Sequence, residues 1–337
     1  MIEFFIRRLL WIVPVLFVVA LVTFFLMHRA PGGPWDREKP VPAVTQQLLN
    51  QKFGLDKPLW FNPKAVGDAR AKGEANPLKL GRAFLDSQFF NYVIGAVQGD
   101  LGPSYQSKGT ETVQAKLKEK FPVTARVGVV AIIFALVIGL PLGVIGALRQ
   151  NSPLDYLSLF LATVGISVPN FIIGVLLIIF LSSALGVAPL RRPEEWQGFG
   201  TAYLLPGIVL GLGTMAFITR LTRSAMLEVK RQDYVRTARA KGLGDRLVIG
   251  RHMLRNSLIP VVTILGPAIA NLVTGSFIIE TIFNVPGMGR EYVTAIAARD
   301  YSMIMGTTLF YALLVALANL SVDLSYGVLD PRIRARR

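Results

Sequence analysis

The sequence predicts an all-α polytopic membrane protein with six transmembrane helices, and three observations support this fold class. Hydrophobic residues make up 52% of the chain and charged residues 17%, whereas an ordinary soluble domain carries about 25% charged residues. The apolar residues gather in long blocks, which is the pattern of membrane proteins. The net charge of +15 comes from basic residues beside these blocks, so it indicates a membrane surface rather than nucleic acid as the partner.

Six apolar segments are long enough to cross a hydrocarbon core of about 30 Å, which needs roughly 20 helical residues. They cover residues 9–27, 123–148, 157–185, 204–219, 258–283 and 303–326. The first is expected to be a retained anchor, because it is too long for the apolar part of a signal peptide and no small-residue cleavage site follows it. The third is interrupted at Pro169.

Basic residues between the apolar segments predict the orientation in the membrane. The loop from Arg220 to Asn256 carries ten Lys and Arg residues against three acidic ones, and the tail at 331–337 adds four Arg residues. Cytoplasmic loops carry such an excess of Lys and Arg. This loop and both termini are therefore predicted to be cytoplasmic.

The segment 28–121 then lies outside the membrane on the opposite side. It is polar, rich in Pro and Gly, and long for a loop, which favours a small external subdomain. Near its end, Val113, Leu117 and Phe121 follow one another at helical spacing and predict an amphipathic helix before Pro122 opens the second span. The predicted organisation is an anchor at 1–27, this external subdomain, a core of five helices at 122–330, and a basic tail at 331–337.

The predicted cytoplasmic loop at 228–257 contains two short helices separated by a glycine turn. The first begins at Asp233, as its N-cap, and ends at Lys241, which matches the helix dipole at both ends. The turn is Gly242-Leu243-Gly244, and a second helix begins near Asp245 with basic and apolar residues interleaved. A tight glycine turn lets the two helices project as one compact knob, which favours docking of a cytoplasmic protein. Contact with anionic lipid is the alternative.

The chain resembles the permease subunits of the oligopeptide/dipeptide family of bacterial ABC importers over nearly its whole length. The resemblance rests on the order of several short strings and not on any single one. They are RRLLWIVPVLFVV at 7–19, APGGP at 30–34, FGLDKPL at 53–59, GDLGPSY at 99–105, FPVT at 121–124, GLPLGVIGALRQNS at 139–152, SVPNF at 167–171, YVRTARAKGLG at 234–244, ETIFNVPGMGREYVTAI at 280–296, ARDY at 298–301 and DPRIR at 330–334. The segment at about 61–89 is extra sequence. Arg236-Thr237-Ala238 stands where the wider superfamily often has Glu-Ala-Ala, a departure that is similar to the peptide-type subfamily.

This resemblance implies the fold of a type I ABC importer transmembrane domain and the function of a permease for di- or oligopeptides in the bacterial inner membrane. It implies four kinds of partner: a second homologous permease, two P-loop ATPase subunits, an external solute-binding protein and the peptide itself. The chain has no G-x-x-x-x-G-K-[ST] phosphate loop, so ATP and Mg²⁺ are expected in the partner subunits and no catalytic residue is expected here. The residues expected to contact the ATPase are Tyr234, Ala238, Lys241, Gly242 and Leu243, with Arg251 and Arg255 as supporting charges.

Three polar residues within the apolar segments are candidates for the translocation path or for a latch between helices. They are Glu280 in the fifth segment and Asn319 and Asp323 in the sixth. An ionised side chain at mid-membrane costs about 2.5–3.5 kcal/mol, so each position needs a reason. Asn319 and Asp323 lie four apart and share a helix face. Their alternative role is to hold neighbouring helices together.

Other classes of protein fit the sequence less well. There is no Cys and the two His residues lie far apart, so neither a thiolate site nor a multi-histidine metal site is predicted. An intramembrane protease would need a Ser–His pair or two facing acids inside the bundle, and neither is evident. A secondary transporter or channel would be expected to show internal duplication and several ionisable groups at mid-membrane. The cargo stays open among dipeptides, oligopeptides, nickel chelates and sugars.

Overall fold

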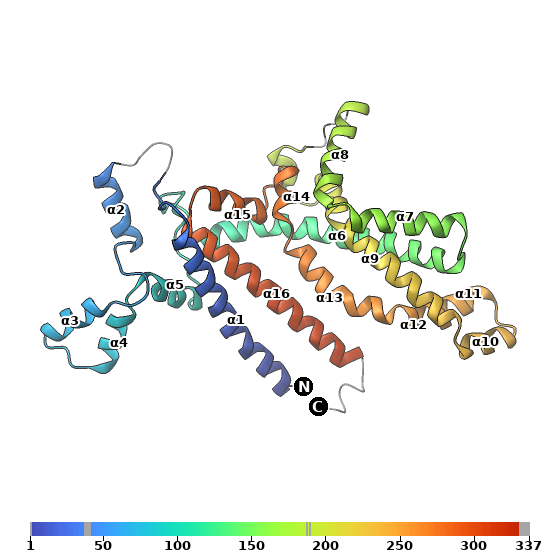
Figure 1. Ribbon diagram of the computed structural model, residues 1–337, viewed down its shortest axis with the longest axis horizontal. Coiled ribbons are helices and arrows are strands. Elements are labelled where there is room, and N and C mark those ends of the chain that lie inside the picture. The colour runs from blue at the N-terminus through green and yellow to red at the C-terminus, as the bar shows by residue number, and fades with distance from the viewer. Residues whose placement is uncertain (1, 37–41, 187, 189, 330–337) are drawn as a thin grey trace. The chain divides into compact units, whose positions relative to one another are not determined.

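The computed structural model describes residues 2–36, 42–186, 188 and 190–329, and for residues 2–4 and 322–329 it describes only the backbone helix (Figure 1). This part of the chain is helical, with a single isolated bridge between Pro103 and Thr112. The all-α prediction is therefore confirmed. The basic tail at 331–337 lies outside the described residues. The chain divides into two compact units, which are described separately.

Four helices are long and apolar enough to cross a membrane: α1 (Ile2–Arg29), α6 (Val113–Leu148), α9 (Leu204–Lys230) and α16 (Tyr301–Leu329). Two further candidates are bent pairs. The first joins α7 (Pro153–Ser167) to α8 (Asn170–Ala184) at 106°, and the second joins the helical run Asp245–Ser257 to α13 (Ile259–Val273) at 50°. Counting each pair as one span gives six among the described residues.

Proline and glycine decide where the helices differ from the predicted segments. The third segment breaks before Pro169, because proline has no N–H and disfavours helix in the residue before it. The fifth ends early, since Gly275 turns the chain with φ +77° before α14 (Phe277–Ile282) begins. The predicted amphipathic stretch and the second apolar segment form one continuous helix, because α6 begins at Val113 and runs through Pro122. Membrane helices tolerate interior proline when other groups satisfy the freed carbonyl.

The first unit comprises Met1–Phe5, Phe121–Arg290 and Leu314–Arg337. Its centre is α9, which packs against α7, α8, α13 and α14. Helices α6 and α9 approach each other closely at glycines. A Cβ atom at Gly143 would lie 2.7 Å from the carbonyl oxygen of Thr219, and one at Gly211 would lie 2.6 Å from that of Ala131. Only glycine permits this backbone-to-backbone contact.

The rest of the first unit connects these helices. Two short 3-10 helices, η1 (Pro193–Trp196) and η2 (Thr201–Tyr203), lead from α8 into α9. After α9 come α10 (Asp233–Ala240), α11 (Asp245–Leu247), a π-helical segment (Val248–Leu254) and α12 (Arg255–Ser257). Buried apolar side chains from α6, α9 and α14 form one continuous cluster around Tyr203 and Phe283.

The second unit comprises Ile6–Lys120 and Glu291–Leu313. It contains α2 (Ala43–Phe53), α3 (Pro63–Ala71), α4 (Pro77–Leu85), α5 (Gln88–Val97) and most of α15 (Met288–Ala297). Phe24 of α1, Phe89 of α5 and Met305 of α16 share one buried cluster. The segment 28–121 is therefore packed onto α1 and the start of α16 and does not stand alone. The extra sequence at 61–89 forms mainly α3 and α4, each capped by an asparagine.

Candidate functional site

The predicted knob is present as residues 233–257, at the end of α9 (Figure 1). Val235 and Ala238 lie on one face of α10 because they are three residues apart. Both are buried, with Met226 of α9 and with Val248 and Met253 of the π-helical segment. The knob is thus fixed to α9 by its own apolar core. Asp233 is the first residue of α10 and not its N-cap, since the capping position is Gln232, whose side chain makes no capping bond.

The glycine turn closes α10 through backbone hydrogen bonds. The Gly242 N–H donates to the Arg239 carbonyl oxygen at 2.9 Å, and the Leu243 N–H donates to that of Ala238 at 3.3 Å. Gly242 has φ +75° and no atom within 4 Å of where a Cβ would stand. A side chain there would strain the backbone without striking a neighbour. The space around Gly242 is therefore open.

The residues predicted to contact an ATPase divide into two groups. Six are exposed, and these are Tyr234, Lys241, Gly242, Leu243, Arg251 and Arg255. Ala238 is only 5% exposed and belongs to the knob's core. Tyr234 has a partner that sequence reasoning missed, because the Asn256 side-chain amide donates to its hydroxyl at 2.8 Å. This bond joins the start of α10 to α12. Contact of these residues with an ATPase stays a prediction.

The stretch after the turn is wider than an α-helix. Residues Val248–Leu254 form a π-helical segment, which directs both Val248 and Met253 into the knob's core. Segments of this kind are uncommon and are frequent at functional sites. Nothing in the sequence pattern indicated it. The surrounding basic residues, Arg246, Arg251 and Arg255, remain on the surface.

An ion pair that the sequence did not indicate fixes α9 near the knob. The Arg223 guanidinium donates from Nε to Asp155 Oδ1 at 2.6 Å and from Nη2 to Oδ2 at 2.8 Å. Oδ2 also accepts the Asn151 N–H at 2.9 Å, and Asp155 is 1% exposed. The pair joins the first turn of α7 to α9, about two helical turns before α9 ends at Lys230. The signal in the sequence is a single acid between two apolar segments, at 123–148 and 157–185.

The three polar candidates within the apolar segments differ in their surroundings. Glu280 lies on α14 with its side chain 1% exposed, and the Arg290 N–H donates to Oε2 at 3.0 Å. Asn319 is exposed on α16. The side chain of Asp323 lies outside the described residues. A role of these residues in the translocation path or in a latch stays a prediction.

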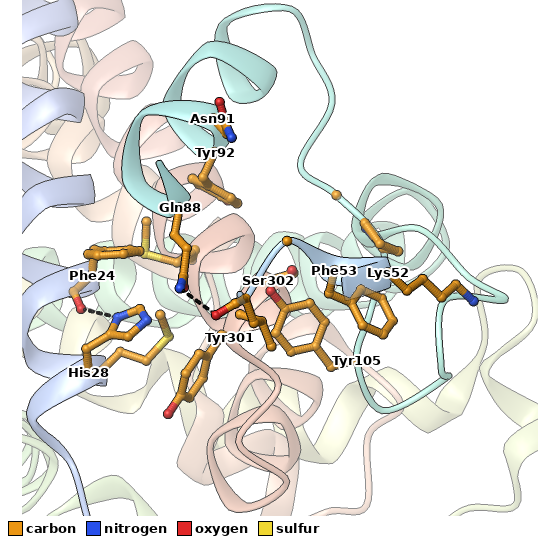
Figure 2. A pocket seen from close by; sticks show the side chains of 16 residues that line it. Phe24, His28, Lys52, Phe53, Gln88, Asn91, Tyr92, Tyr105, Tyr301 and Ser302 are labelled. Atoms are coloured by element: carbon orange, nitrogen blue, oxygen red, sulfur yellow. Dashed lines mark hydrogen bonds between the residues drawn. The ribbon is translucent and has the colours of Figure 1, made fainter. Parts of the chain in front are cut away.

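A cavity of about 190 Å³ lies within the second unit, between α1, α2, α5 and α16 (Figure 2). Aromatic rings dominate its wall. His28 is part of this packing, because Nδ1 hydrogen-bonds to the Phe24 carbonyl oxygen at 2.9 Å and the two rings lie 4.1 Å apart. Burial raises the pKa of Tyr105 to about 12 and also raises that of Tyr92, so both hydroxyls stay protonated at neutral pH. No group of three metal-ligating side chains occurs among the residues described.

Comparison with known proteins identifies the class of this chain. Residues 139–335 match the family model of the binding-protein-dependent transport system inner membrane component. The chain is 40% identical over 337 residues to the dipeptide transport system permease protein DppB of Bacillus subtilis. The matched residues cover 100% of this chain and 99% of the relative. It is 35% identical over 335 residues to the oligopeptide transport system permease protein OppB of Salmonella typhimurium, covering 99% of this chain and 100% of the relative.

A solved structure shows the same fold. It is a chain of the MetNI methionine ABC transporter in an inward-facing conformation. The superposition has a TM-score of 0.50 at 19% identity, and it covers 64% of this chain and 96% of the MetNI chain. The family match, the relatives and the fold together identify a multi-pass membrane permease of the ABC importer type. The chain belongs to the family of binding-protein-dependent transport system inner membrane components. Permeases of this family work with ATPase and binding-protein partners, and an uncoupled secondary transporter or channel is not favoured.

Proposed function

We propose that this chain forms the translocation path for di- or oligopeptides in a bacterial inner-membrane importer driven by ATP. The observation that carries the proposal is the knob, an exposed basic turn held rigidly by its own core on the end of α9. The names of the relatives, which are dipeptide and oligopeptide permeases, support peptides as the cargo. No residue of this chain needs to perform chemistry for that role.

The knob supplies the contact with the ATPase. Tyr234, Lys241 and Leu243 are exposed around the turn, and Arg251 and Arg255 place positive charge beside it. ATP and Mg²⁺ are bound by the partner, because this chain has no phosphate-binding loop. When two ATPase subunits close on ATP, they move the knob, and the knob moves the helices to which it is fixed. This is a rigid-body transition between two packed states.

The assembly contains two different permeases, two ATPase subunits and one external solute-binding protein. The knob and both termini face the cytoplasm, which is supported by the ten basic residues between Arg220 and Asn256. The segment 28–121 then faces the binding protein. Exposed apolar residues along α1, such as Leu10, Trp11 and Val13, are the lipid-facing surface of the complex.

A mild-detergent purification of this chain from its native membrane tests the assembly. Mass spectrometry is expected to identify a second permease of this family and P-loop ATPases in the wild-type complex. The variant Gly242→Trp should lose the ATPases, because the side chain strains and blocks the turn. Gly73→Trp is the matched control, since Gly73 also has positive φ, +81°, and open surroundings but lies outside the knob. Recovery of the chain alone, under conditions where a control complex survives, would overturn the proposal.

The cargo is tested with the purified complex and its binding protein in liposomes. Uptake of labelled di- and oligopeptides is expected to require ATP on the side of the knob. Selective uptake of a sugar or a nickel chelate, with peptides excluded, would refute peptides as the substrate while leaving the ATP-driven importer intact.

A further inference from the structure

The carboxylate of Glu280 lies in a cradle that only glycines can form. A Cβ atom at Gly287 would stand 2.5 Å from Glu280 Oε2, one at Gly275 would stand 2.8 Å from Oε1, and one at Gly289 would stand 3.0 Å from Oε2. Real Cβ atoms keep larger distances than these. The three glycines therefore leave the room that the carboxylate occupies. Gly275 precedes α14, and the other two lie just before and within the start of α15.

Thr124 of α6 completes the cradle from the other side. A Cβ atom at Gly287 would also stand 2.6 Å from the Thr124 hydroxyl oxygen. This oxygen accepts the Met288 N–H at 2.8 Å, while Glu280 Oε2 accepts the Arg290 N–H at 3.0 Å. Thr124 is 0% exposed and Glu280 1%. Two buried side chains from two different helices thus hold the backbone of residues 285–290, and all of these groups lie in the first unit.

One oxygen of this carboxylate is left without a hydrogen bond. Glu280 Oε1 is buried and has no donor among the residues that the structure describes. A buried polar atom without a partner destabilises the arrangement that buries it. The hydrogen bonds from the Met288 and Arg290 N–H groups therefore stabilise the arrangement that buries Glu280, whereas the unpaired Oε1 destabilises it. Such a balance suits a contact that must form and break.

The chain connects this contact directly to the knob. The knob ends with α12, which continues through Leu258 into α13, and α13 leads through Gly275 to Glu280. At 1.5 Å per residue, the 15 residues of α13 span about 22 Å. A displacement of the knob thus reaches the carboxylate through one helix, while Thr124 lies on α6, which packs on α9 through glycines.

We propose that Thr124 and Glu280 form a latch that holds residues 285–290 in place in this conformation and opens once in each transport cycle. The two residues act as positioning residues and do not touch the cargo. The latch rests on the proposed function in one respect, because its opening is measured through ATP-driven transport. It lies at the end of α13 opposite the knob, so it would control the far side of the transporter.

A disulfide can replace the latch because the chain contains no cysteine. The variant Thr124→Cys with Met288→Cys places one thiol on each side of the contact, because the Met288 N–H lies 2.8 Å from the Thr124 hydroxyl oxygen, and titration of free thiols shows whether the disulfide has formed. Oxidation of the reconstituted complex should lower peptide uptake about tenfold or more relative to the same complex after reduction. The two single-cysteine variants, treated with the same oxidant, are the controls. Equal uptake by the oxidised and reduced double variant would overturn the opening step.

A series at Glu280 tests the latch without the disulfide. Glu280→Gln keeps the length of the side chain and an oxygen that accepts the Arg290 N–H, so uptake should stay within about twofold of wild type. Glu280→Asp withdraws the carboxylate by one methylene. Peptide uptake should then fall about tenfold. The amount of assembled complex should stay the same, and the complex should still hydrolyse ATP. Equal loss in both variants would refute the latch, because charge rather than position would then matter.

The outcomes separate the latch from the proposed function. Uptake of no peptide by the wild-type complex would refute peptides as the cargo. In that case the latch is tested by measuring the ATP hydrolysis that the binding protein stimulates. Oxidation of the double-cysteine variant should still suppress this hydrolysis if the latch must open. A loss confined to the yield of complex, with normal uptake per assembled complex, would show that Glu280 only stabilises the fold and would overturn its positioning role.

Discussion

The ion pair between Asp155 and Arg223 is expected to contribute more stability to this chain than any single exposed charge. Arg223→Met removes both guanidinium hydrogen bonds and leaves the Asp155 carboxylate with the Asn151 N–H alone. Asp155 is 1% exposed and the Arg223 side chain is 19% exposed, so water reaches the arginine but hardly the acid. Breaking a buried pair in this way costs about 3–5 kcal/mol. Because Arg223 keeps some exposure, we expect about 3 kcal/mol, near the lower end of that range.

Unfolding of the purified chain in mixed micelles, with an increasing fraction of denaturing detergent, measures this free energy. Arg220→Met is the control, since Arg220 is exposed on the same helix one turn earlier, and its change should stay within about 0.5 kcal/mol. Asp155→Asn combined with Arg223→Met should recover part of the loss, because no unpaired charge remains buried. If Arg223→Met unfolds at the same detergent fraction as Arg220→Met, the reasoning from burial is wrong.

Three further predictions concern other parts of the chain. Met253→Ala leaves a cavity at a 0% exposed position in the knob's core, so the free energy of unfolding should fall by about 2–5 kcal/mol. Tryptic cleavage at Lys241 should then be faster, and Arg251→Ala is the surface control. Gly143→Ala should prevent stable folding, because its Cβ would lie 2.7 Å from a backbone oxygen, whereas Gly67→Ala meets nothing within 4 Å and should be neutral by the same detergent titration. The hydrogen bond from Lys57, with a second from Asn91, holds the pKa of Asp86 below its ordinary 3.8. A depressed pKa gives stability that is present above 3.8 and lost as the pH falls through the lower folded-state value, so Asp86→Asn should flatten the acid limb of the stability profile; an unchanged acid limb would contradict the assignment.

Much of the fold could be predicted because the membrane imposes a simple length rule on apolar helices. The breaks were harder. Pro169 indicates an interruption, but the sequence does not show that one helix runs through Pro122, since a proline that ends a helix in water can lie inside one in a membrane bundle. The turn at Gly275 was missed, because a single glycine within an apolar block carries no signal of its own until its neighbours crowd it.

The candidate site was predictable where its contacts are local. The turn at Gly242 follows from a short run of residues, and the inward face of α10 follows from the spacing of Val235 and Ala238. The ion pair joins residues 68 positions apart, and the contact between Met288 and Thr124 joins residues 164 positions apart. No local pattern encodes such pairs, so only the folded chain could reveal them.

The two long-range contacts also decide which helices of the first unit can move as one body. Glycine contacts fix α6 to α9, and the ion pair fixes the start of α7 to α9 as well. Met226 of α9 lies within the knob's core, so the knob follows α9 on that side. On its other side the knob continues into α13, which carries Glu280 beyond Gly275. A displacement carried from the knob along α13 would therefore shift Glu280 relative to Thr124 on α6. That shift would have to break the hydrogen bond from the Met288 N–H to the Thr124 hydroxyl oxygen or the one from the Arg290 N–H to Glu280 Oε2.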